Sequence, residues 1–385
     1  MQNNTIVVTC AKGIIPYLKQ ELQDLGLPVV AETVASVMTQ GGMDEAMRLN
    51  LFLRTGHRVL LMLKEFTAHN ADELYRELFH IRWEEYIPED SYVCVTSSVD
   101  NPTINDTRYA NLKCKDAVVD RILHVCGRRP DSGSDRSRCV VYLYWKGNAC
   151  VVYLDTSGEA LSKRGYRKIP MKAPMQETLA AAVIMATGWQ GRTDFINPMC
   201  GSGTLAIEAA LIARGKPPGL LRRNFAFMHY RGYDAGVWEA LRLEAEKMVR
   251  AKAEVSIIAS DIDPDTVDAA GKNALVAGVS DDIFFDVCDF AETDLPGHGG
   301  VVVLNPEYGE RLGSEEALEQ TYSAIGDFFK QRCKGYTGYI FTGNTSLAKK
   351  VGLRPKRRIP FFNADIECRL LEYELYEGTK KVSKL

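Results

Sequence analysis

The chain has no C-x-x-C pair among its ten cysteines, and no apolar run long enough to cross a membrane. The first absence argues against a zinc ribbon or a thioredoxin-type redox site. The second argues against a transmembrane helix, which needs about 18 or more apolar residues. The opening residues MQNNTIVVTC also lack the features of a signal peptide. These absences predict a cytoplasmic protein with no metal site and no membrane partner, whose Cys10, Cys94 and Cys288 are small apolar residues.

The composition is that of a soluble globular protein of two or three domains, with 46% hydrophobic and 25% charged residues over 385 positions. The net charge of −3 is unevenly distributed. Residues 106–175 carry 14 Lys and Arg against 7 Asp and Glu, a net charge of +7, while residues 1–105 carry 8 against 14 and residues 176–385 carry 25 against 29. A basic middle segment fits a surface that faces a polyanion, and equally a solvated charged face.

The first part of the chain consists of short strands and helices. Its features include strands at 5–10, 29–40 and 58–66, a basic helix at 106–126, a polar loop at 127–137, and a hairpin around Gly147-Asn148. A basic stretch with two prolines and few apolar residues then follows. We therefore expect one subdomain over 1–63, a second α/β unit over 64–157, a basic linker over 158–175, and a larger domain over 176–385.

The larger domain alternates helices with almost continuous apolar strands, which predicts a parallel sheet covered on both faces. The expected strands lie at 192–196, 255–260, 283–288, 300–304 and 336–343. Two last strands, at 357–362 and 365–378, have no helix between them. An antiparallel hairpin is therefore expected to complete the sheet.

A glycine-rich loop follows the first of these strands and opens an apolar helix. Gly201 and Gly203 allow a tight turn and a close approach to a ligand, and the helix N-terminus favours negative charge. The spacing also fits a dinucleotide fingerprint, which would require an acid about 20 residues further on. The corresponding stretch LLRRNFAFMHY has none, so an NAD(P)-dependent dehydrogenase is the weaker alternative. The loop residues are Asn197, Pro198, Met199, Cys200, Gly201, Ser202, Gly203 and Thr204.

Polar residues follow the next strands at the same edge of the predicted sheet. Asp261, before Ile262 and Asp263, could accept hydrogen bonds from both ribose hydroxyls of an adenosine. Asp289 could accept one from the adenine amino group, and Phe290 could pack on the ring. Each acid alone is more often a turn or helix cap, but together they predict one ligand crevice at this edge.

These motifs resemble those of the class I methyltransferases that depend on S-adenosyl-L-methionine (AdoMet) and act on amino groups. The matching stretches are NPMCGSGT, SDIDPDTVDAAGKNALVAGV, CDF and NPEYGERLG. Four further stretches resemble the THUMP-domain RNA methyltransferases, and within these the branch that makes N2-methylguanine in 23S rRNA. They are NLFLRTGHRVLLMLKEF, LDTSGEALSKRGYR, APMQETLAAAVI and FNADIECRL.

The resemblance implies a fold and a set of partners. It implies a ferredoxin-like subdomain and a THUMP domain before a Rossmann-like, seven-stranded methyltransferase domain with an antiparallel terminal hairpin. The implied substrate is guanine N2 in 23S rRNA or in a large-subunit assembly intermediate, and the implied cofactor is AdoMet. Three positions depart from the family pattern: Asn197 stands for Asp, Glu307 for Pro, and Gln176 for Lys.

The corner Asn305-Pro306-Glu307-Tyr308 is the predicted catalytic site. The Asn305 side-chain oxygen and the Pro306 carbonyl could each accept an N–H of the amine, which would free the nitrogen lone pair. Tyr308 could stack on a flipped base. Glu307 either contacts the substrate edge or is a surface acid. Carbon methylation would need a cysteine at this corner, which has none, and Cys200 is interpreted as a small buried residue.

The predicted RNA contacts lie on the basic helix and in the basic linker. The segment from Tyr166 to Glu177, with Glu159, is alternatively expected to fold back over the cofactor. Amino-methylation of DNA adenine or cytosine, of tRNA guanine, or of a protein glutamine would use the same corner, and the basic segment and the front half of the chain argue against the DNA and protein substrates. The predicted RNA-contacting residues are Arg108, Lys113, Lys115, Arg121, Lys163, Arg164, Tyr166, Arg167 and Lys168.

Overall fold

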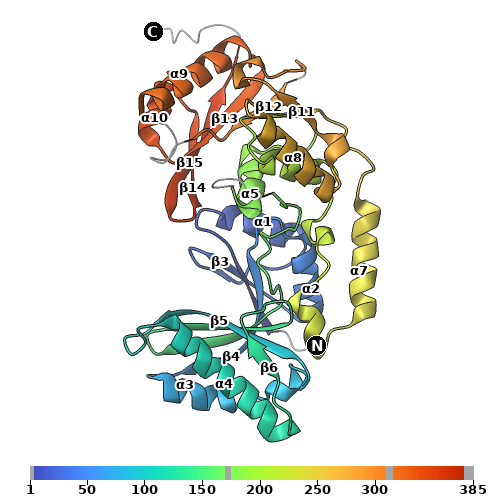
Figure 1. Cartoon of the computed structure of the whole chain (residues 1–385), viewed down its shortest axis with the longest axis vertical. Helices are drawn as coiled ribbons and strands as arrows, with labels where there is room; N and C mark the ends of the chain where they lie inside the picture. Colours follow the sequence, from blue (N-terminus) through green and yellow to red (C-terminus); the bar gives the residue numbers. More distant parts are fainter. Residues whose placement is uncertain (1–3, 170–174, 298, 308–314, 377–385) are drawn as a thin grey trace. The chain divides into compact units, whose positions relative to one another are not determined.

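The computed structural model describes residues 4–169, 175–297, 299–307 and 315–376 (Figure 1). The described chain divides into two units. Unit 1 comprises residues 1–10, 18–163 and 218–246, and unit 2 comprises residues 11–17, 164–217 and 247–385. The chain therefore passes from one unit to the other five times, and neither unit is a continuous stretch of sequence.

Unit 1 is built on one eight-stranded sheet with the order β2-β3-β1-β4-β8-β7-β5-β6. Helices α3 and α4 lie side by side against its second half (Figure 1). Its strands are β1 (Asn4–Thr9), β2 (Ala31–Glu32), β3 (Ser36–Gly41), β4 (Arg58–Thr67), β5 (Tyr92–Asp100), β6 (Asp131–Gly133), β7 (Cys139–Lys146) and β8 (Ala149–Asp155). Its helices are α2 (Met43–Phe52), α3 (Ala71–Phe79) and α4 (Thr107–Cys126), and α1 (Ile15–Asp24) begins in unit 2 and continues into unit 1.

Strand β4 joins the two halves of this sheet. Its first part pairs with β1 and its length from Leu60 to Thr67 pairs with β8, with a register shift between Met62 and Lys64. The boundary expected near residue 63 falls at this bulge, inside one continuous strand. A bulge lets a strand bend and twist more strongly. Strand β4 can therefore belong to both halves of the sheet, although each half packs against its own helices.

Two local predictions in unit 1 were wrong. The single strand expected over 29–40 is a hairpin of β2 and β3, because Thr33 and Ser36 form a turn through their side chains and the Thr33 N–H donates to the Ser36 carbonyl at 2.8 Å. The loop expected over 127–137 contains β6, which pairs in parallel with β5. Helix α4 begins and ends as its sequence predicts, with Asp106 as N-cap and Gly127 in the left-handed region.

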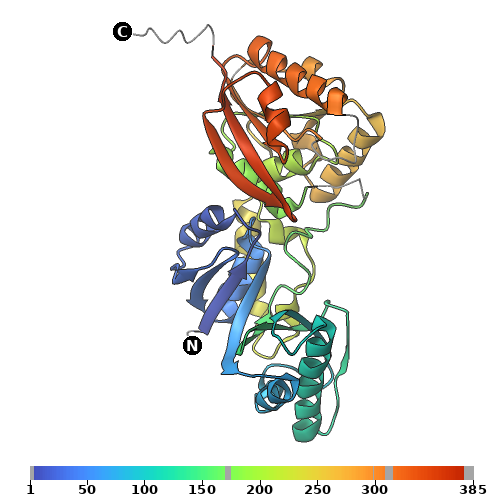
Figure 2. The ribbon, with the colours of Figure 1, turned by 90° about the vertical axis from the view of Figure 1, so that its left-hand side faces the viewer.

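Unit 2 contains a seven-stranded sheet with the order β11-β10-β9-β12-β13-β15-β14. The first five strands are parallel, and β15 runs antiparallel to both β13 and β14. Figure 2 shows the long terminal hairpin. The strands are β9 (Asp194–Pro198), β10 (Ile257–Asp261), β11 (Phe284–Val287), β12 (Gly300–Leu304), β13 (Tyr336–Thr342), β14 (Arg357–Asn363) and β15 (Ile366–Glu374).

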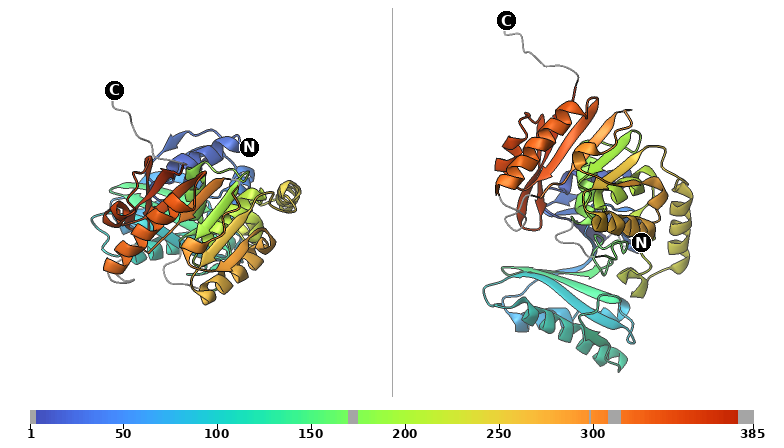
Figure 3. Two further views of the ribbon diagram at one scale, coloured as in Figure 1. Left: turned by 90° about the horizontal axis from the view of Figure 1, so that it is seen from above. Right: turned by 45° about the horizontal axis from the view of Figure 1, so that its top comes forward.

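Helices cover both faces of this sheet, as the apolar strands predict (Figure 3). On one face Ile196, Val302 and Ile340 pack with Tyr322 and Ile325 of α9 in a buried cluster. On the other face the Tyr339 hydroxyl donates to the Thr187 carbonyl at the end of α5, at 3.1 Å. The helices are α5 (Glu177–Thr187), α6 (Thr204–Ala213), α8 (Pro264–Ala277), α9 (Glu315–Gln331) and α10 (Thr345–Lys350).

The segment between α6 and β10 packs into unit 1. It contains two 3₁₀ turns, Pro218–Leu221 and Ala226–His229, followed by α7 (Ala235–Met248). The Tyr230 hydroxyl donates to the Val140 carbonyl at 2.7 Å, and the Phe227 N–H donates to the Thr156 carbonyl at 3.0 Å. Phe227 also stacks on Phe225, and both rings meet Trp238 edge-on. A segment inserted between two elements of unit 2 thus completes the core of unit 1.

This packing predicts that residues 164–385 do not form a stable domain when expressed alone. The buried rings of Phe225, Phe227, Tyr230 and Trp238 would lose their cover and expose a large apolar patch. We expect an aggregating fragment that binds a hydrophobic dye and melts without a cooperative transition, whereas the full chain melts cooperatively.

The matched control replaces residues 218–246 of the same fragment by a short glycine-serine loop. This second fragment should be more soluble than the first. If the unmodified fragment is soluble and melts as sharply as the full chain, the rings of residues 218–246 do not need unit 1 to cover them.

Candidate active site

The glycine-rich loop turns sharply between β9 and α6. Met199, Gly201 and Gly203 have φ angles of 56°, 54° and 79°, all in the left-handed region. A Cβ atom on Gly203 would lie 2.9 Å from the Cβ of Ala270 on α8, whereas one on Gly201 would meet no atom within 4 Å. Gly203 therefore permits close helix packing, while Gly201 borders open space. A non-glycine residue held at positive φ, as Met199 is, is typical of functional sites.

Asp261 joins the loop to the end of β10. Its Oδ2 accepts a hydrogen bond from the Gly201 N–H at 2.9 Å, and the Cys200 N–H donates to the Ser260 carbonyl at the same distance. The side chain of Ile262 is 70% exposed beside this carboxylate and offers an apolar surface to a ligand. The structure thus brings the loop and the first predicted ribose acceptor together.

The other two acids of the predicted crevice are helix caps. Asp263 accepts hydrogen bonds from the Asp265 N–H and the Thr266 hydroxyl at the start of α8. Asp289 accepts one from the Ala291 N–H at 2.9 Å, and Phe290 meets Phe328 of α9 edge-on at 5.9 Å. Both carboxylates are exposed; Asp263 accepts one bond on each oxygen, while Asp289 accepts one bond and keeps more capacity for another.

The acceptor corner follows β12, the strand next to β9. The Asn197 amide on β9 donates to the Val303 carbonyl on β12 at 2.8 Å, just before Asn305 and Pro306. Among the described residues, the buried Asn305 Oδ1 atom has no hydrogen-bond partner. Glu307 is exposed, and Tyr308 lies outside the described residues. An unpartnered buried oxygen costs about 1–3 kcal/mol, and the Asn197 Oδ1 atom on β9 is in the same situation among the described residues.

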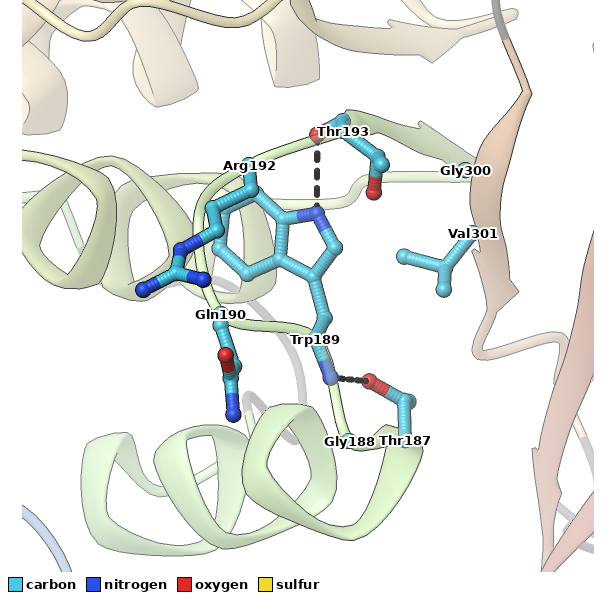
Figure 4. Close-up of a pocket in the computed structure, with 8 residues that line it drawn as sticks. All are labelled: Thr187, Gly188, Trp189, Gln190, Arg192, Thr193, Gly300 and Val301. Atoms are coloured by element: carbon cyan, nitrogen blue, oxygen red, sulfur yellow. Dashed lines mark hydrogen bonds between the residues drawn. The ribbon is translucent and has the colours of Figure 1, made fainter.

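The glycine loop and this corner flank the point where the strand order reverses. Strands β10 and β11 follow on one side of β9, and β13, β15 and β14 on the other side of β12. Open α/β sheets bind their ligands at such a point, at the carboxyl ends of the strands. A pocket of about 370 Å³ opens at the opposite edge, beside Trp189, Arg192 and Gly300 (Figure 4). None of the predicted site residues lines that pocket.

Arg164 and Tyr166 do not offer a surface to RNA in this structure, which corrects the prediction for both. Both side chains are 1% exposed, and both face Glu208 of α6, which is itself fully buried. The Arg164 guanidinium lies 3.4 Å from the Glu208 carboxylate, and the Tyr166 hydroxyl donates to it at 3.1 Å. Burial, followed by the Glu208 charge, raises the pKa of Tyr166 far above its usual value. The basic segment is therefore anchored, at this point, within unit 2.

Arg167 and Lys168 connect the same segment to the glycine loop. The Arg167 Nη2 donates to the Met175 carbonyl at 2.6 Å and to the Thr204 hydroxyl at 3.0 Å. The Lys168 N–H donates to the Asn273 side chain, whose amide donates to the Ser202 carbonyl. Sequence reasoning missed Glu208 and Asn273, although a glutamate within the apolar helix TLAIEAALIA was a usable signal.

The cations predicted on the basic helix α4 are paired with acids. Arg121 makes two hydrogen bonds to Glu84, and Lys113 reaches Asp72. The remaining pairs are Arg108 with Asp106, Lys115 with Asp116 and, in the segment predicted to be a linker (158–175), Lys163 with Glu159. Exposed pairs of this kind contribute little to stability. Only Asp72 and Glu84 lie outside residues 106–175, so two of these pairs offset positive charge that the net value of +7 for that segment had left over.

Cys200 is a buried thiol. Burial, followed by the nearby charge of Asp261, raises its pKa well above the usual value. A nucleophilic cysteine needs the opposite, a lowered pKa. In the residues that the structure describes, no group of three or more His, Cys, Asp or Glu side chains is arranged to hold a metal ion. Over the same residues, no helix is long and apolar enough to span a bilayer.

Three family descriptions match successive parts of the chain. Residues 5–60 match the RlmL ferredoxin-like domain, residues 68–155 match the THUMP domain, and residues 164–372 match the RMKL-like methyltransferase domain. A putative RNA methyltransferase of Synechocystis is 34% identical over 96% of both chains. The ribosomal RNA large subunit methyltransferase K/L of Syntrophotalea carbinolica is 36% identical over 96% of this chain and 53% of its own length. This chain thus spans about half of that relative.

A solved structure agrees over nearly the whole chain. A putative methyltransferase in complex with S-adenosylhomocysteine (SAH) is 27% identical, with a TM-score of 0.88, covering 98% of this chain and 100% of that one. The expected fold class is confirmed: a ferredoxin-like subdomain and a THUMP domain precede a Rossmann-like domain with seven strands and a terminal antiparallel hairpin. The chain belongs to the RMKL-like methyltransferase family.

Proposed function

We propose that this protein transfers the methyl group of AdoMet to an exocyclic amine of a base in RNA, namely guanine N2 in large-subunit rRNA. The observation that carries the proposal is the buried Asn305 Oδ1 atom, which has no hydrogen-bond partner among the described residues and lies across the strand-order reversal from the glycine loop. We further propose the division into 1–63, 64–157, 158–175 and 176–385 as subdomain, THUMP domain, linker and methyltransferase domain.

AdoMet is the cofactor, and it supplies a methyl group on a positively charged sulfur. The residues present fit such a ligand. Gly201 borders open space at the end of β9, and the Asp261 carboxylate can accept ribose hydroxyls. The exposed Ile262 offers an apolar surface next to it, and Asp289 can accept from an amino group. The walls of the cofactor site around these contacts would be formed by the other predicted residues, namely Asn197, Pro198, Met199, Cys200, Ser202, Thr204, Asp263 and Phe290.

The acceptor corner can activate an amine that is a poor nucleophile. The lone pair of an exocyclic base nitrogen is delocalised into the ring. If the Asn305 Oδ1 and the Pro306 carbonyl each accept one N–H, the nitrogen is held pyramidal and its lone pair is aimed in line. Each bond contributes about 0.5–1.5 kcal/mol in net terms. Orientation in the crevice must therefore supply much of the acceleration. Tyr308, outside the described residues, would stack on the base.

RNA is the substrate favoured by the front half of the chain and by its relatives. Residues 68–155 match the THUMP domain, and the relatives carry the names of RNA and ribosomal RNA methyltransferases. We propose 23S rRNA, free or in a large-subunit assembly intermediate, as the partner, and the cytoplasm as the location. DNA adenine or cytosine and tRNA guanine are the competing substrates for the same corner, and a dehydrogenase is the competing enzyme class.

The first test is methyl transfer by the purified protein. We expect radiolabelled AdoMet to label large-subunit rRNA from cells that lack the protein, with the label in N2-methylguanine after nucleoside analysis. AdoMet, but not NAD(P), should raise the melting temperature. Label in methyladenine would overturn the substrate assignment, and stabilisation by NAD(P) alone would favour the dehydrogenase.

Substituting Asn305→Ala should lower kcat by about 10²-fold, the typical cost of deleting one oriented polar contact to a reacting group. Since Asn305 faces the acceptor, the dissociation constant of AdoMet should stay within about twofold, as measured by calorimetry. Asn305→Asp keeps the acceptor oxygen and is expected to retain more activity than Asn305→Ala. Equal activity of Asn305→Ala and the unaltered protein would remove Asn305 from the mechanism.

Cys200→Ala should retain methyl transfer within about threefold. The thiol is buried with a raised pKa, so the reaction loses no nucleophile when it is removed. A variant that still binds AdoMet yet makes no product would instead support carbon methylation through a cysteine.

Arg167→Met should weaken AdoMet binding about tenfold while leaving the salt dependence of RNA binding unchanged. The guanidinium holds Thr204, the first residue of α6, in the cradle, and a loss of about 1.4 kcal/mol corresponds to one buried charge-assisted hydrogen bond. Lys163→Ala is the matched control, because Lys163 is an exposed cation of the same basic segment. A changed salt slope with normal AdoMet affinity would return Arg167 to the RNA-binding role predicted from sequence.

A further inference from the structure

Two segments of unit 1 that are distant in sequence meet at one hydrogen bond. The Asn224 side-chain amide donates to the Ser137 carbonyl at 2.7 Å, and the Asn224 Oδ1 contacts the His229 ring nitrogen at 2.8 Å. Arg136 and Arg138 flank Ser137, and Arg223 precedes Asn224. The hydrogen bond therefore joins two segments that carry three arginines next to it in sequence, and we call Arg136, Arg138 and Arg223 the arginine patch.

The backbone beneath the arginine patch is held in place by buried contacts. The Arg222 guanidinium donates to the carbonyls of Ser157 and Glu159, each at 3.0 Å, and lies over the Phe225 ring at 4.5 Å. Gly158, with φ of 72°, leaves room for the carbonyl of Arg136, which would lie 2.7 Å from a Cβ at that position. The segments that carry the patch are thus preorganised, which lowers the entropy lost when a ligand binds.

The members of the arginine patch form no salt bridge within the described residues, although the charge of Arg136 helps to lower the pKa of Glu159 and that of Arg138 helps to lower the pKa of Asp135. Among the described residues, no carboxylate lies within ion-pair distance of Arg136, Arg138 or Arg223, and the latter two are exposed. The nearby acids have other partners. Asp135 accepts from Ser137, Asp155 pairs with Arg58, and Glu159 pairs with Lys163. This contrasts with α4, where each of the four predicted cations has an acid beside it.

The positive charge of the patch helps to lower the pKa of two neighbouring histidines. Burial, and then the charges of Arg58 and Arg136, lower the pKa of His57 to about 4. Burial, and then Arg138, lower the pKa of His229. Both rings are therefore neutral at pH 7, and the three guanidinium groups provide the positive charge of the patch.

We propose that the arginine patch binds the phosphate backbone of the RNA substrate, in place of the basic face of α4. The inference rests on the proposed function for the identity of the polyanion. Guanidinium groups that form no salt bridge, on a fixed backbone, match phosphate oxygens and carry no information about base sequence. The patch would therefore set affinity and orientation, whereas base selection is left to the crevice of unit 2.

The test compares two double variants on an in vitro transcript of large-subunit rRNA. Arg138→Ala with Arg223→Ala should weaken binding about tenfold or more at 0.1 M salt and lower the slope of log K against log salt by about 2 in magnitude. Lys113→Ala with Lys115→Ala, on α4, should change that slope by less than about 0.5. Melting temperature and AdoMet affinity, measured for both variants, separate lost RNA contacts from misfolding.

The outcomes distinguish the two proposals. If the α4 variant loses affinity and slope while the patch variant keeps both, the arginine patch is not the phosphate-binding surface. If both variants bind as the unaltered protein does, the patch is also overturned. If the unaltered protein binds AdoMet but neither binds nor methylates the transcript, the proposed substrate fails instead. Arg138→Lys with Arg223→Lys keeps the charge and should recover most of the lost slope.

Discussion

The pairing of β9 with β12 is the constraint on which the candidate site depends. These two parallel strands are adjacent in the sheet although more than one hundred residues separate them in the chain. Because both run in the same direction, their carboxyl ends meet at one edge. The loop after β9 then lies beside the corner after β12. The proposed cofactor cradle and the proposed acceptor groups could not be assembled from either strand alone.

Much of this arrangement could be predicted from the sequence because it follows from local patterns. Nearly continuous apolar strands separated by helices predict a parallel sheet, and a parallel sheet places every strand end at one edge. That reasoning predicted that Gly201, Asp261 and Asn305 follow strands at one edge of the sheet, and they do; their roles at a ligand site stay a prediction. It could not separate ligands from caps, since Asp263 and Asp289 satisfy the rules for both. Only the hydrogen bonds to Asp265, Thr266 and Ala291 show the capping roles.

The basic residues were harder to predict, because net charge along a sequence does not show which charges are paired in space. Helix α4 carries four Lys and Arg, yet two of their partners, Asp72 and Glu84, come from elements some forty residues earlier. Arg164 looked like a surface residue until Glu208 of α6 was placed against it. Conversely, Arg138 and Arg223 are 85 residues apart in the sequence, and a tertiary contact between their neighbours Ser137 and Asn224 brings their segments together.

Asn197, which stands where the family pattern has Asp, forms a hydrogen bond between the same two strands. Its amide donates to the Val303 carbonyl across the gap between β9 and β12, two residues before Asn305. An ionised carboxylate has no proton to donate and could not form this bond. The asparagine therefore adds a fully buried link between the strand that leads into the cofactor loop and the strand that leads into the acceptor corner. Under the proposed function, methyl transfer requires donor and acceptor to stay in line, so a link at this position would stiffen the separation between the proposed cradle and the proposed acceptor corner.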